Sequence, residues 1–431
     1  MLWLDSRDAD FESRFARLVD ARRESDEDVR GDVAAILRDV RAEGDAEVIE
    51  LTRRFDRHEL DDGDESWWFG PDAFRRAYDA LETDLRDALD LAATRIRAYH
   101  EAQLPEDRDY TDDAGVRLGA KWRAVDAAGI YVPGGRAAYP SSLLMNAIPA
   151  KVAGVERIVA VSPTPRGQIN PLVLAAAHIA GLDRLWRIGG AQAIAALAYG
   201  TQRIARVDVI TGPGNAWVAE AKRQLYGVVG IDMVAGPSEI LVIADGENDP
   251  DWIAADLLSQ AEHDPSSQSI LITDDAAFAR RVEDRVTVQS SMLSTRKVAQ
   301  ESWNAHGTII VVDHLDEAVP LADRLAAEHV ELAVADPEPM MDRLRHAGSV
   351  FLGRMTPEAV GDYVAGPNHV LPTGRRARFA SGLSVLDFMK RTSFLSVGDN
   401  GLDAIGPAGI ALAHAEGLPA HARSIELRMG K

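Results

Sequence analysis

The chain contains no cysteine. This absence excludes disulfide bonds, thiolate zinc sites, iron–sulfur clusters and cysteine nucleophiles. An aldehyde intermediate therefore cannot be held as a thiohemiacetal. Any transition-metal site must use histidine, carboxylate or neutral oxygen ligands.

Positive charge and long apolar runs are also scarce. The chain has 47 Lys and Arg against 68 Asp and Glu, for a net charge of −21. This balance argues against nucleic-acid binding, which needs a basic surface, and is typical of a solvated acidic surface such as that of proteins from a high-salt cytoplasm. No apolar run reaches the roughly 18 residues of a membrane span. Residues 1–14 lack the basic and apolar regions of a signal peptide, so we expect a cytoplasmic protein without nucleic-acid or membrane partners.

The length and periodicity predict two α/β sheets. A chain of 431 residues is expected to form two to four units. After two helical stretches, 26–55 and 72–104, short β-branched runs alternate with helices, and this rhythm continues to residue 352. Such alternation predicts parallel sheets covered by helices on both faces. Past residue 382 we expect an appendage, with an amphipathic stretch at 405–416 and a strand-like end at 424–428.

Three glycine-rich turns follow or continue apolar runs in the middle of the chain. They are Y-V-P-G-G-R at 131–136, I-G-G-A-Q at 188–192 and T-G-P-G-N at 211–215. Glycine allows close approach of a ligand, and helix N-termini favour anions such as pyrophosphate. Each turn alone is compatible with an ordinary strand–helix connection, but three in one sheet favour a nucleotide. A G-x-G-x-x-G motif with an acidic residue on the next strand is absent.

Four polar segments carry candidate chemistry. Gln260 and His263 lie three residues apart at a predicted helix end, so they share one face and can reach one metal ion. Glu328 and His329 are adjacent and can act as two proton-transfer groups. Taken alone, Glu328 and His329 are equally compatible with a solvated helix end, and Gln260 and His263 are more typical of an ordinary one. Metalloprotease and nucleobase deaminase motifs are absent.

The other two segments are loops. The stiff segment 361–369 contains Asp362, a possible metal ligand, and His369, a possible group for an anion or carbonyl. The segment 416–421 contains Glu416, a possible anchor for a cationic group, and His421, a possible ligand from the tail. Each is also compatible with a polar surface. The remaining histidines have no partner pattern and are interpreted as structural or surface residues: His58, His100, His178, His306, His314, His346 and His414.

Taken together, these segments resemble the histidinol dehydrogenase family. The resemblance runs from the N-terminal helices to the tail, over nine ordered blocks: Y-V-P-G-G, A-Y-P-S-S-x-L-M-N-A-I-P-A-K-V-A-G-V, G-G-A-Q-A-I-A-A-L-A-Y-G, T-G-P-G-N, A-G-P-S-E-I-L-V-I-A-D, Q-A-E-H-D-P, E-H-V-E-L, G-D-Y-x-x-G-x-N-H-V-L-P-T and A-E-x-L-x-x-H. Val330, Val364 and Pro367 depart from the family pattern without changing a candidate ligand.

The resemblance implies a fold, an activity and two cofactors. The activity is the NAD-dependent oxidation of L-histidinol to L-histidine through a bound aldehyde, at the end of histidine biosynthesis, with one Zn²⁺ per subunit. The fold is α/β, with two incomplete Rossmann-like domains and small terminal segments that exchange in a homodimer. The expected divisions are an N-terminal segment at 1–25, a first domain at 26–129 plus 239–382, an NAD-binding domain at 130–238, and a tail at 383–431.

The resemblance also implies residue roles. The expected zinc ligands are Gln260, His263, Asp362 and, from the partner's tail, His421. These four and His329 are also expected to contact substrate, together with Ser238, His369 and Glu416. Tyr131, Gln192 and Asn215 are expected to contact NAD. Glu328 and His329 are the expected proton-transfer pair: His329 takes the hydroxyl proton, and Glu328 activates water for the second oxidation.

Two rival functions remain possible at this point. One is a related zinc- and NAD-dependent dehydrogenase for another diol such as sulfopropanediol; residues 138–142, Ser238 and the pair Glu416 and His369 favour histidinol. The other is an inactive, metal-bound dimer with a structural or regulatory role, against which the intact Glu328–His329 pair argues.

Overall fold

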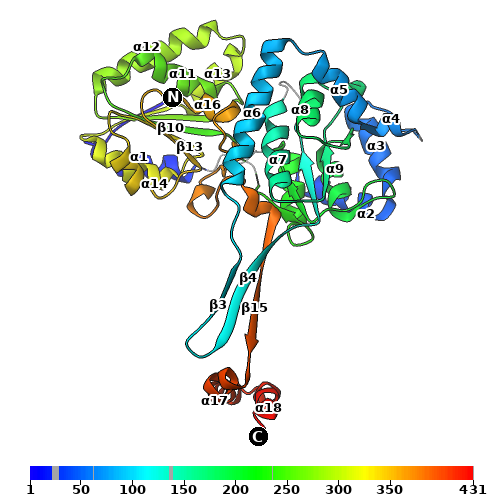
Figure 1. Ribbon diagram of the computed structural model, residues 1–431. Coiled ribbons are helices and arrows are strands. Elements are labelled where there is room, and N and C mark those ends of the chain that lie inside the picture. Colours follow the sequence, from blue (N-terminus) through cyan, green and yellow to red (C-terminus); the bar gives the residue numbers. More distant parts are fainter. Residues whose placement is uncertain (22–28, 62, 135–138, 235, 431) are drawn as a thin grey trace.

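The structure is a computed structural model that describes residues 1–21, 29–61, 63–134, 139–234 and 236–430. In this part of the chain, two six-stranded sheets are covered by helices, and a three-stranded arm projects away from both (Figure 1). No described helix is both long and apolar enough to cross a bilayer.

The first sheet, named the β5 sheet, is parallel except for its edge strand β2. Its strand order is β2 (Trp68–Phe69), β7 (Leu185–Trp186), β6 (Arg157–Val161), β5 (Ala127–Tyr131), β8 (Val209–Thr211) and β9 (Gly230–Ile231). One face packs against α2 (Arg30–Glu43), α3 (Asp45–Asp56), α4 (Asp64–Trp67), α9 (Gly190–Tyr199) and α10 (Ala216–Leu225). The other packs against α5 (Pro71–Asp79), α6 (Thr83–Glu101), α7 (Pro140–Val152) and α8 (Pro171–Ile179). The chain leaves β5 toward β6 and leaves β8 toward β9, so the sheet's topological switch point lies between β5 and β8.

The second sheet, named the β10 sheet, is wholly parallel. Its order is β1 (Leu2–Asp5), β12 (Thr308–Val311), β11 (Gln268–Thr273), β10 (Glu239–Ala244), β13 (His329–Ala333) and β14 (Ser349–Leu352). One face packs against α11 (Pro250–Ala261), α12 (Ala276–Met292) and α13 (Arg296–His306). The other packs against α1 (Phe11–Asp20), α14 (Ala318–Leu325) and α15 (Glu338–Arg343).

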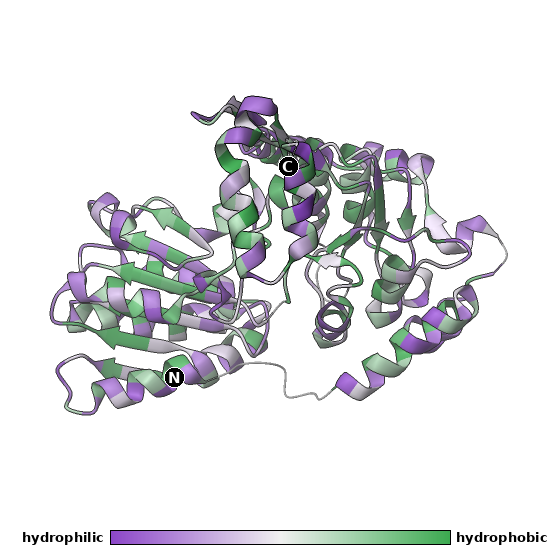
Figure 2. Ribbon diagram, turned by 90° about the horizontal axis from the view of Figure 1, so that it is seen from below, coloured by the Kyte–Doolittle hydropathy of each residue, from purple (hydrophilic) through white to green (hydrophobic). Residues whose placement is uncertain are grey.

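The strand sequences explain why both sheets are buried. All six residues of β10 and all six of β11 are buried, and each strand contains an unbroken apolar run, at 240–244 and 270–272. Parallel strands with helices on both faces have this pattern. Hydrophobic residues therefore gather along the strands, whereas the outer surfaces of the helices carry the hydrophilic residues (Figure 2). The predicted α/β class with two sheets is confirmed.

The arm consists of three antiparallel strands that carry two helices at its end. Strand β4 (Val116–Ala124) lies between β3 (Arg108–Thr111) and β15 (Met389–Val397), and α17 (Asp399–Ala415) and α18 (Pro419–Arg428) follow (Figure 1). Every residue of β3 is exposed, and Leu395 in β15 is 69% exposed. Neither face of the arm is covered along its length in this single chain.

Two features differ from the sequence predictions. Residues 424–428 form the end of α18 and not a strand, because Pro419 starts a helix that packs against α17. The helices between residues 30 and 101 pack on the β5 sheet, whereas the predicted division groups residues 26–129 with 239–382. Strand β1, which the predicted division assigns to a separate N-terminal segment, pairs with β12 and belongs to the β10 sheet. The domain boundaries themselves stay a prediction, and the boundary at residue 25 falls outside the described residues.

Candidate metal and catalytic site

The centre of the site lies at the amino end of the β10 sheet. His329 is the first residue of β13, where it pairs with Ile240 of β10 and Ser349 of β14. Glu328 directly precedes the strand, and both residues are buried, at 6% and 4% exposure for Glu328 and His329. A central strand therefore fixes the backbone of the predicted proton-transfer pair.

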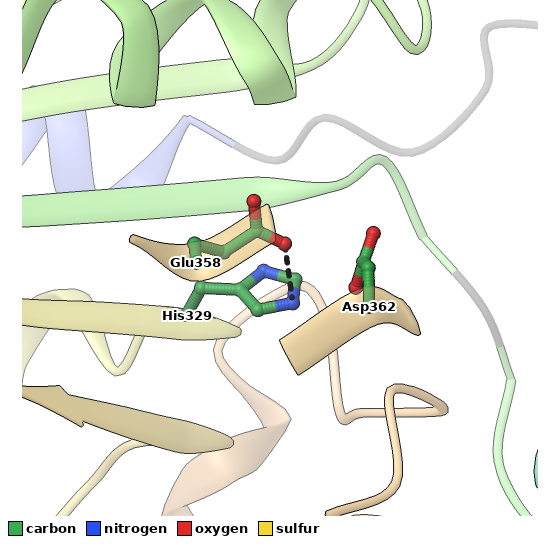
Figure 3. Close-up of side chains that lie close together, drawn as sticks. All are labelled: His329, Glu358 and Asp362. Atoms are coloured by element: carbon green, nitrogen blue, oxygen red, sulfur yellow. Dashed lines mark ion pairs between the residues drawn. The ribbon is translucent and has the colours of Figure 1, made fainter. Parts of the chain in front are cut away.

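Both ring nitrogens of His329 face specific groups. Nδ1 lies 3.0 Å from the carbonyl oxygen of Glu239 and 3.0 Å from the side-chain nitrogen of Gln260. Nε2 lies 3.5 Å from Oε1 of Glu358 (Figure 3). A proton on Nδ1 donated to the Glu239 carbonyl leaves Nε2 with a free lone pair, the form that a general base needs.

The same pocket contains a set of atoms suited to a divalent cation. His329, Glu358 and Asp362 each offer a ligand atom, and these atoms lie within 4.8 Å of one another (Figure 3). Three buried atoms have no hydrogen-bond partner: Oε1 of Gln260, Nε2 of His329 and Oε1 of Glu358. A buried polar atom without a partner costs about 1–3 kcal/mol. Amide oxygen, imidazole nitrogen and carboxylate oxygen are zinc ligands, so the residues present fit a zinc ion.

Two further predicted residues face this space. Nδ1 of His369 lies 3.0 Å from the backbone oxygen of Asp362 and 3.7 Å from its Oδ1. Burial lowers the pKa of His369. The charge of Asp362 opposes this lowering, and nearby His263 adds to it. Asp362 likewise raises the pKa of His329, and His263 lowers it, so both residues lie close to the proposed proton-transfer pair.

Burial dominates the electrostatics of the proton-transfer pair. It lowers the pKa of His329 to about 4. It raises the pKa of Glu328 well above its usual range, although the backbone N–H of Glu239 donates to Oε2 of this carboxylate at 3.0 Å and opposes the rise. Two groups of opposite titration behaviour thus share one pocket, as acid–base catalysis requires.

The segment that carries Asp362 and His369 is anchored to the other half of the molecule. The guanidinium of Arg95 in α6 donates to the carbonyls of Val364 and Ala365, at 2.5 and 3.0 Å. The amide of Asn368 donates to the carbonyl of Met145 in α7 at 2.6 Å. The departures Val364 and Pro367 therefore lie in a loop that side chains of the β5-sheet half hold in place.

The remaining substrate residues divide into two groups. Ser238 directly precedes β10, and its carbonyl accepts the backbone N–H of Gln268, so Ser238 lies at the same edge as Glu328. Glu416 and His421 lie at the end of the arm, exposed and away from the β10 sheet in this single chain (Figure 1). The structure therefore brings together Gln260, His263, Asp362, Glu328, His329 and His369, but neither Glu416 nor His421.

The three glycine-rich turns meet at the carboxyl edge of the β5 sheet. Tyr131 ends β5, Gln192 lies in the first turn of α9, and Asn215 caps α10, where its side chain accepts the N–H of Val218 at 3.2 Å. The hydroxyl of Tyr131 accepts the N–H of Gly190 at 3.1 Å. These residues lie around the switch point between β5 and β8, where open α/β sheets bind ligands. Residues 135–138, part of the first turn and of the block used against the diol alternative, fall outside the described residues.

Glu358 is a site residue that the sequence reasoning missed. Its side chain is 2% exposed and contacts Nε2 of His329 and, through Oε2 at 3.1 Å, the hydroxyl of Ser259. Burial, reinforced by Asp362, raises the pKa of Glu358 to about 8. The signal in the sequence was its position four residues before Asp362, one turn earlier on helix α16 (Glu358–Tyr363).

Comparisons with known proteins agree along the whole chain. The family model described as histidinol dehydrogenase matches residues 19–429. The chain is 62% identical to histidinol dehydrogenase from Zymomonas mobilis subsp. mobilis, over all of both chains. It is 61% identical to the enzyme from Rhodospirillum rubrum, over 100% of this chain and 99% of the relative. The crystal structure of histidinol dehydrogenase from Elizabethkingia anophelis matches with a TM-score of 0.94 at 35% identity, covering 100% of this chain and 98% of the other.

Proposed function

Because the chain belongs to the histidinol dehydrogenase family, we propose that the buried groups at the amino end of the β10 sheet catalyse the two-step oxidation of histidinol by NAD. The chain is an NAD-dependent oxidoreductase that acts on histidinol. The alternative substrate, a diol such as sulfopropanediol, is not supported, since the relatives at 61 and 62% identity are histidinol dehydrogenases. The observation that carries the residue roles is the buried Nε2 of His329, which has no hydrogen-bond partner and lies beside Glu358 in the same group of ligand atoms as Asp362.

Gln260, His263 and Asp362 would hold the zinc ion, together with His421 from a second copy of the chain. When bound, zinc would orient the imidazole and amino nitrogens of histidinol, and NAD would accept hydride from the carbinol carbon. Asp362 is the residue common to these expected ligands and to the group of ligand atoms described above. Glu358 belongs to that group as well, and its carboxyl group is placed to orient Asp362 by hydrogen bonding.

His329 is the base of both oxidation steps in this proposal. Its Nδ1 is engaged by the Glu239 carbonyl, so Nε2 is the nitrogen that receives the hydroxyl proton of the substrate. Glu328 is the group that activates water for attack on the bound aldehyde, and Ser238, His369 and Glu416 bind substrate. Burial of the pair excludes bulk water, which keeps the reactive aldehyde in place between the two steps.

Tyr131, Gln192 and Asn215 are the proposed NAD contacts. They are supported by their common position at the switch point of the β5 sheet, next to glycine-rich turns and the N-termini of α9 and α10. We place the reaction in the cytoplasm because it depends on NAD and serves amino-acid synthesis. Activity confined to the membrane fraction of a cell lysate would refute that location.

A count of products tests the reaction and the zinc requirement. Purified protein with zinc, histidinol and NAD is expected to form two NADH per histidine and to contain one zinc per subunit. Full activity of a metal-free preparation would contradict the proposed site.

The two members of the pair are separated by isosteric variants. Glu328→Gln is expected to accumulate aldehyde, because the first oxidation needs only His329, whereas His329→Asn is expected to slow both steps by about 10²–10⁴-fold. Rapid-quench analysis of bound intermediates measures the difference. Normal turnover by both variants would exclude these roles.

The arm supports a homodimer in which each site is completed by a second copy. An uncovered three-stranded ribbon buries too little apolar surface to be stable by itself, and α17 and α18 at its end carry Glu416 and His421. Mixing His421→Asn with His329→Asn protein tests this exchange. If the site is shared, subunit reassortment restores about a quarter of the wild-type activity, since half the dimers regain one of two sites. If both residues act within one chain, the mixture stays inactive.

A further inference from the structure

A buried ion pair lies directly beneath the third glycine-rich turn and has no part in the mechanism above. Lys222 of α10 pairs with Asp232, which follows β9, and their side chains are 2% and 1% exposed. A lysine is almost never fully buried unless it is paired, and a buried pair is a poor way to gain stability over apolar packing. Its position therefore needs a specific reason.

The pair holds both polar groups of one peptide unit, that of Gly212. Lys222 Nζ donates to the Gly212 carbonyl at 3.0 Å, and the Gly212 N–H donates to Oδ2 of Asp232 at 2.8 Å. The backbone N–H of Met233 donates to the other carboxylate oxygen at 2.6 Å. Lys222 lies ten residues beyond Gly212, in α10. Its side chain therefore reaches back toward the start of the helix and holds the turn that precedes it.

Gly212 has little freedom to move from this position. Its φ is +109°, and a Cβ on it would lie 2.1 Å from the carbonyl oxygen of Tyr131. The turn of residues 211–215 is thus fixed against the end of β5 on one side and by the ion pair on the other. Asn215 closes the turn by capping α10.

We propose that Lys222 and Asp232 are positioning residues for NAD, which set the placement of the Gly212–Asn215 turn at the switch point of the β5 sheet. The role rests on the proposed function, since it requires that Tyr131, Gln192 and Asn215 contact NAD. The pair does not touch the reacting atoms, so its loss weakens NAD binding without changing the chemistry or the affinity for histidinol.

The test is the double substitution Lys222→Met with Asp232→Asn, which leaves no unpaired buried charge. In the zinc-loaded enzyme, KM for NAD is expected to rise at least about tenfold, while kcat at saturating NAD and KM for histidinol stay within about twofold. A lower melting temperature with unchanged KM for NAD would overturn the proposal, because it would show a structural role only. If the double variant does not fold, Lys222→Arg, which keeps the ion pair with Asp232 but changes the donor to the Gly212 carbonyl, is judged by the same ratio of the two KM changes.

Two further variants separate the possible failures. Arg354→Met removes a partly buried ion pair with Asp245 at the carboxyl edge of the β10 sheet and must leave KM for NAD unchanged. Asn215→Ala must raise KM for NAD if the NAD site is correct. If Asn215→Ala raises KM for NAD but the double variant does not, the positioning role of Lys222 and Asp232 is refuted. If neither variant raises KM for NAD, the proposed NAD site is refuted.

Discussion

The two six-stranded sheets share the same switch-point topology, yet their proposed functional residues lie at opposite edges. In the β5 sheet, Tyr131, Gln192 and Asn215 lie at the carboxyl ends of the strands. In the β10 sheet, Ser238 and the pair Glu328 and His329 lie at the amino ends. Fold topology alone would place both sites at carboxyl edges.

Helix polarity accounts for the difference. At the carboxyl edge of the β5 sheet, the N-termini of α9 and α10 present positive dipole ends, which suit an anionic dinucleotide. At the amino edge of the β10 sheet, α11 and α16 contact each other and carry Gln260 and Asp362 near their C-termini, and Glu328 follows the C-terminus of α14. Negative dipole ends and carboxylates suit a cation. Each edge is therefore suited to a ligand of the opposite charge.

The carboxyl edge of the β10 sheet shows the same rule by contrast. A cavity of about 520 Å³ opens there, lined by Glu247, Asp249, Trp252 and Arg354 among others. The side chain of Asp249 caps α11 by accepting the N–H of Asp251, so an anionic group of the protein already occupies the helix N-terminus. At the carboxyl edge of the β5 sheet, by contrast, α10 is capped by the neutral Asn215.

Matched glycine substitutions give the largest expected difference between the two carboxyl edges. Gly212→Ala forces a positive φ and a clash with a strand carbonyl, so we expect a loss above about 3 kcal/mol in stability and a raised KM for NAD. Gly353→Ala, after β14, has a φ of +86° but open space around the Cβ, so about 1 kcal/mol is expected, with no change in KM. Thermal unfolding and NAD titration measure both. Equal losses of stability and equal changes in KM for NAD in the two variants would show that the two carboxyl edges do not differ in this way.

Matched carboxylates test the use of the amino edge. Glu358→Gln removes a buried carboxyl group that faces His329 and Asp362, and kcat is expected to fall by about 10–100-fold. Glu247→Gln removes an 81% exposed carboxylate at the opposite edge of the same sheet and is expected to leave kcat unchanged. Steady-state kinetics at saturating zinc measure the ratio. A similar kcat for both variants would show that Glu358 has no part in orienting the site.

The sequence was sufficient for the sheets and for the residues that come from one local pattern. The buried apolar run of β10 predicted a parallel strand. The spacing of Gln260 and His263 predicted a shared helix face, but α11 ends at Ala261 and His263 lies in the turn that follows. Glu358 was missed because a single glutamate in a helix is normally exposed, and only the fold shows it buried against His329. The pair Lys222 and Asp232 joins a helix to the end of an edge strand, a long-range contact without periodicity in the sequence.

The smallest expected effect concerns the joint between the two halves, at His100 of α6. Its Nδ1 faces the carbonyl of Ile96 at 2.7 Å, and its Nε2 faces the amide of Asn368 at 3.3 Å, near the loop that carries His369. Burial lowers the pKa of His100 below its usual 6.5, because a charged ring would lose solvation.

The folded chain thus binds a proton at His100 less readily than the unfolded chain. The stabilisation from neutral His100 is complete above the unfolded pKa of 6.5 and is lost as the pH falls below it, by at most about 1.4 kcal/mol per pH unit. Melting temperatures measured from about pH 7 to pH 5 should therefore fall less steeply for His100→Gln than for the wild type. His314→Gln, at a side chain that is 81% exposed, serves as the control and should keep the wild-type slope. If the melting temperatures of His100→Gln and the wild type fall in parallel with pH, protonation of His100 does not contribute to the loss of stability in acid.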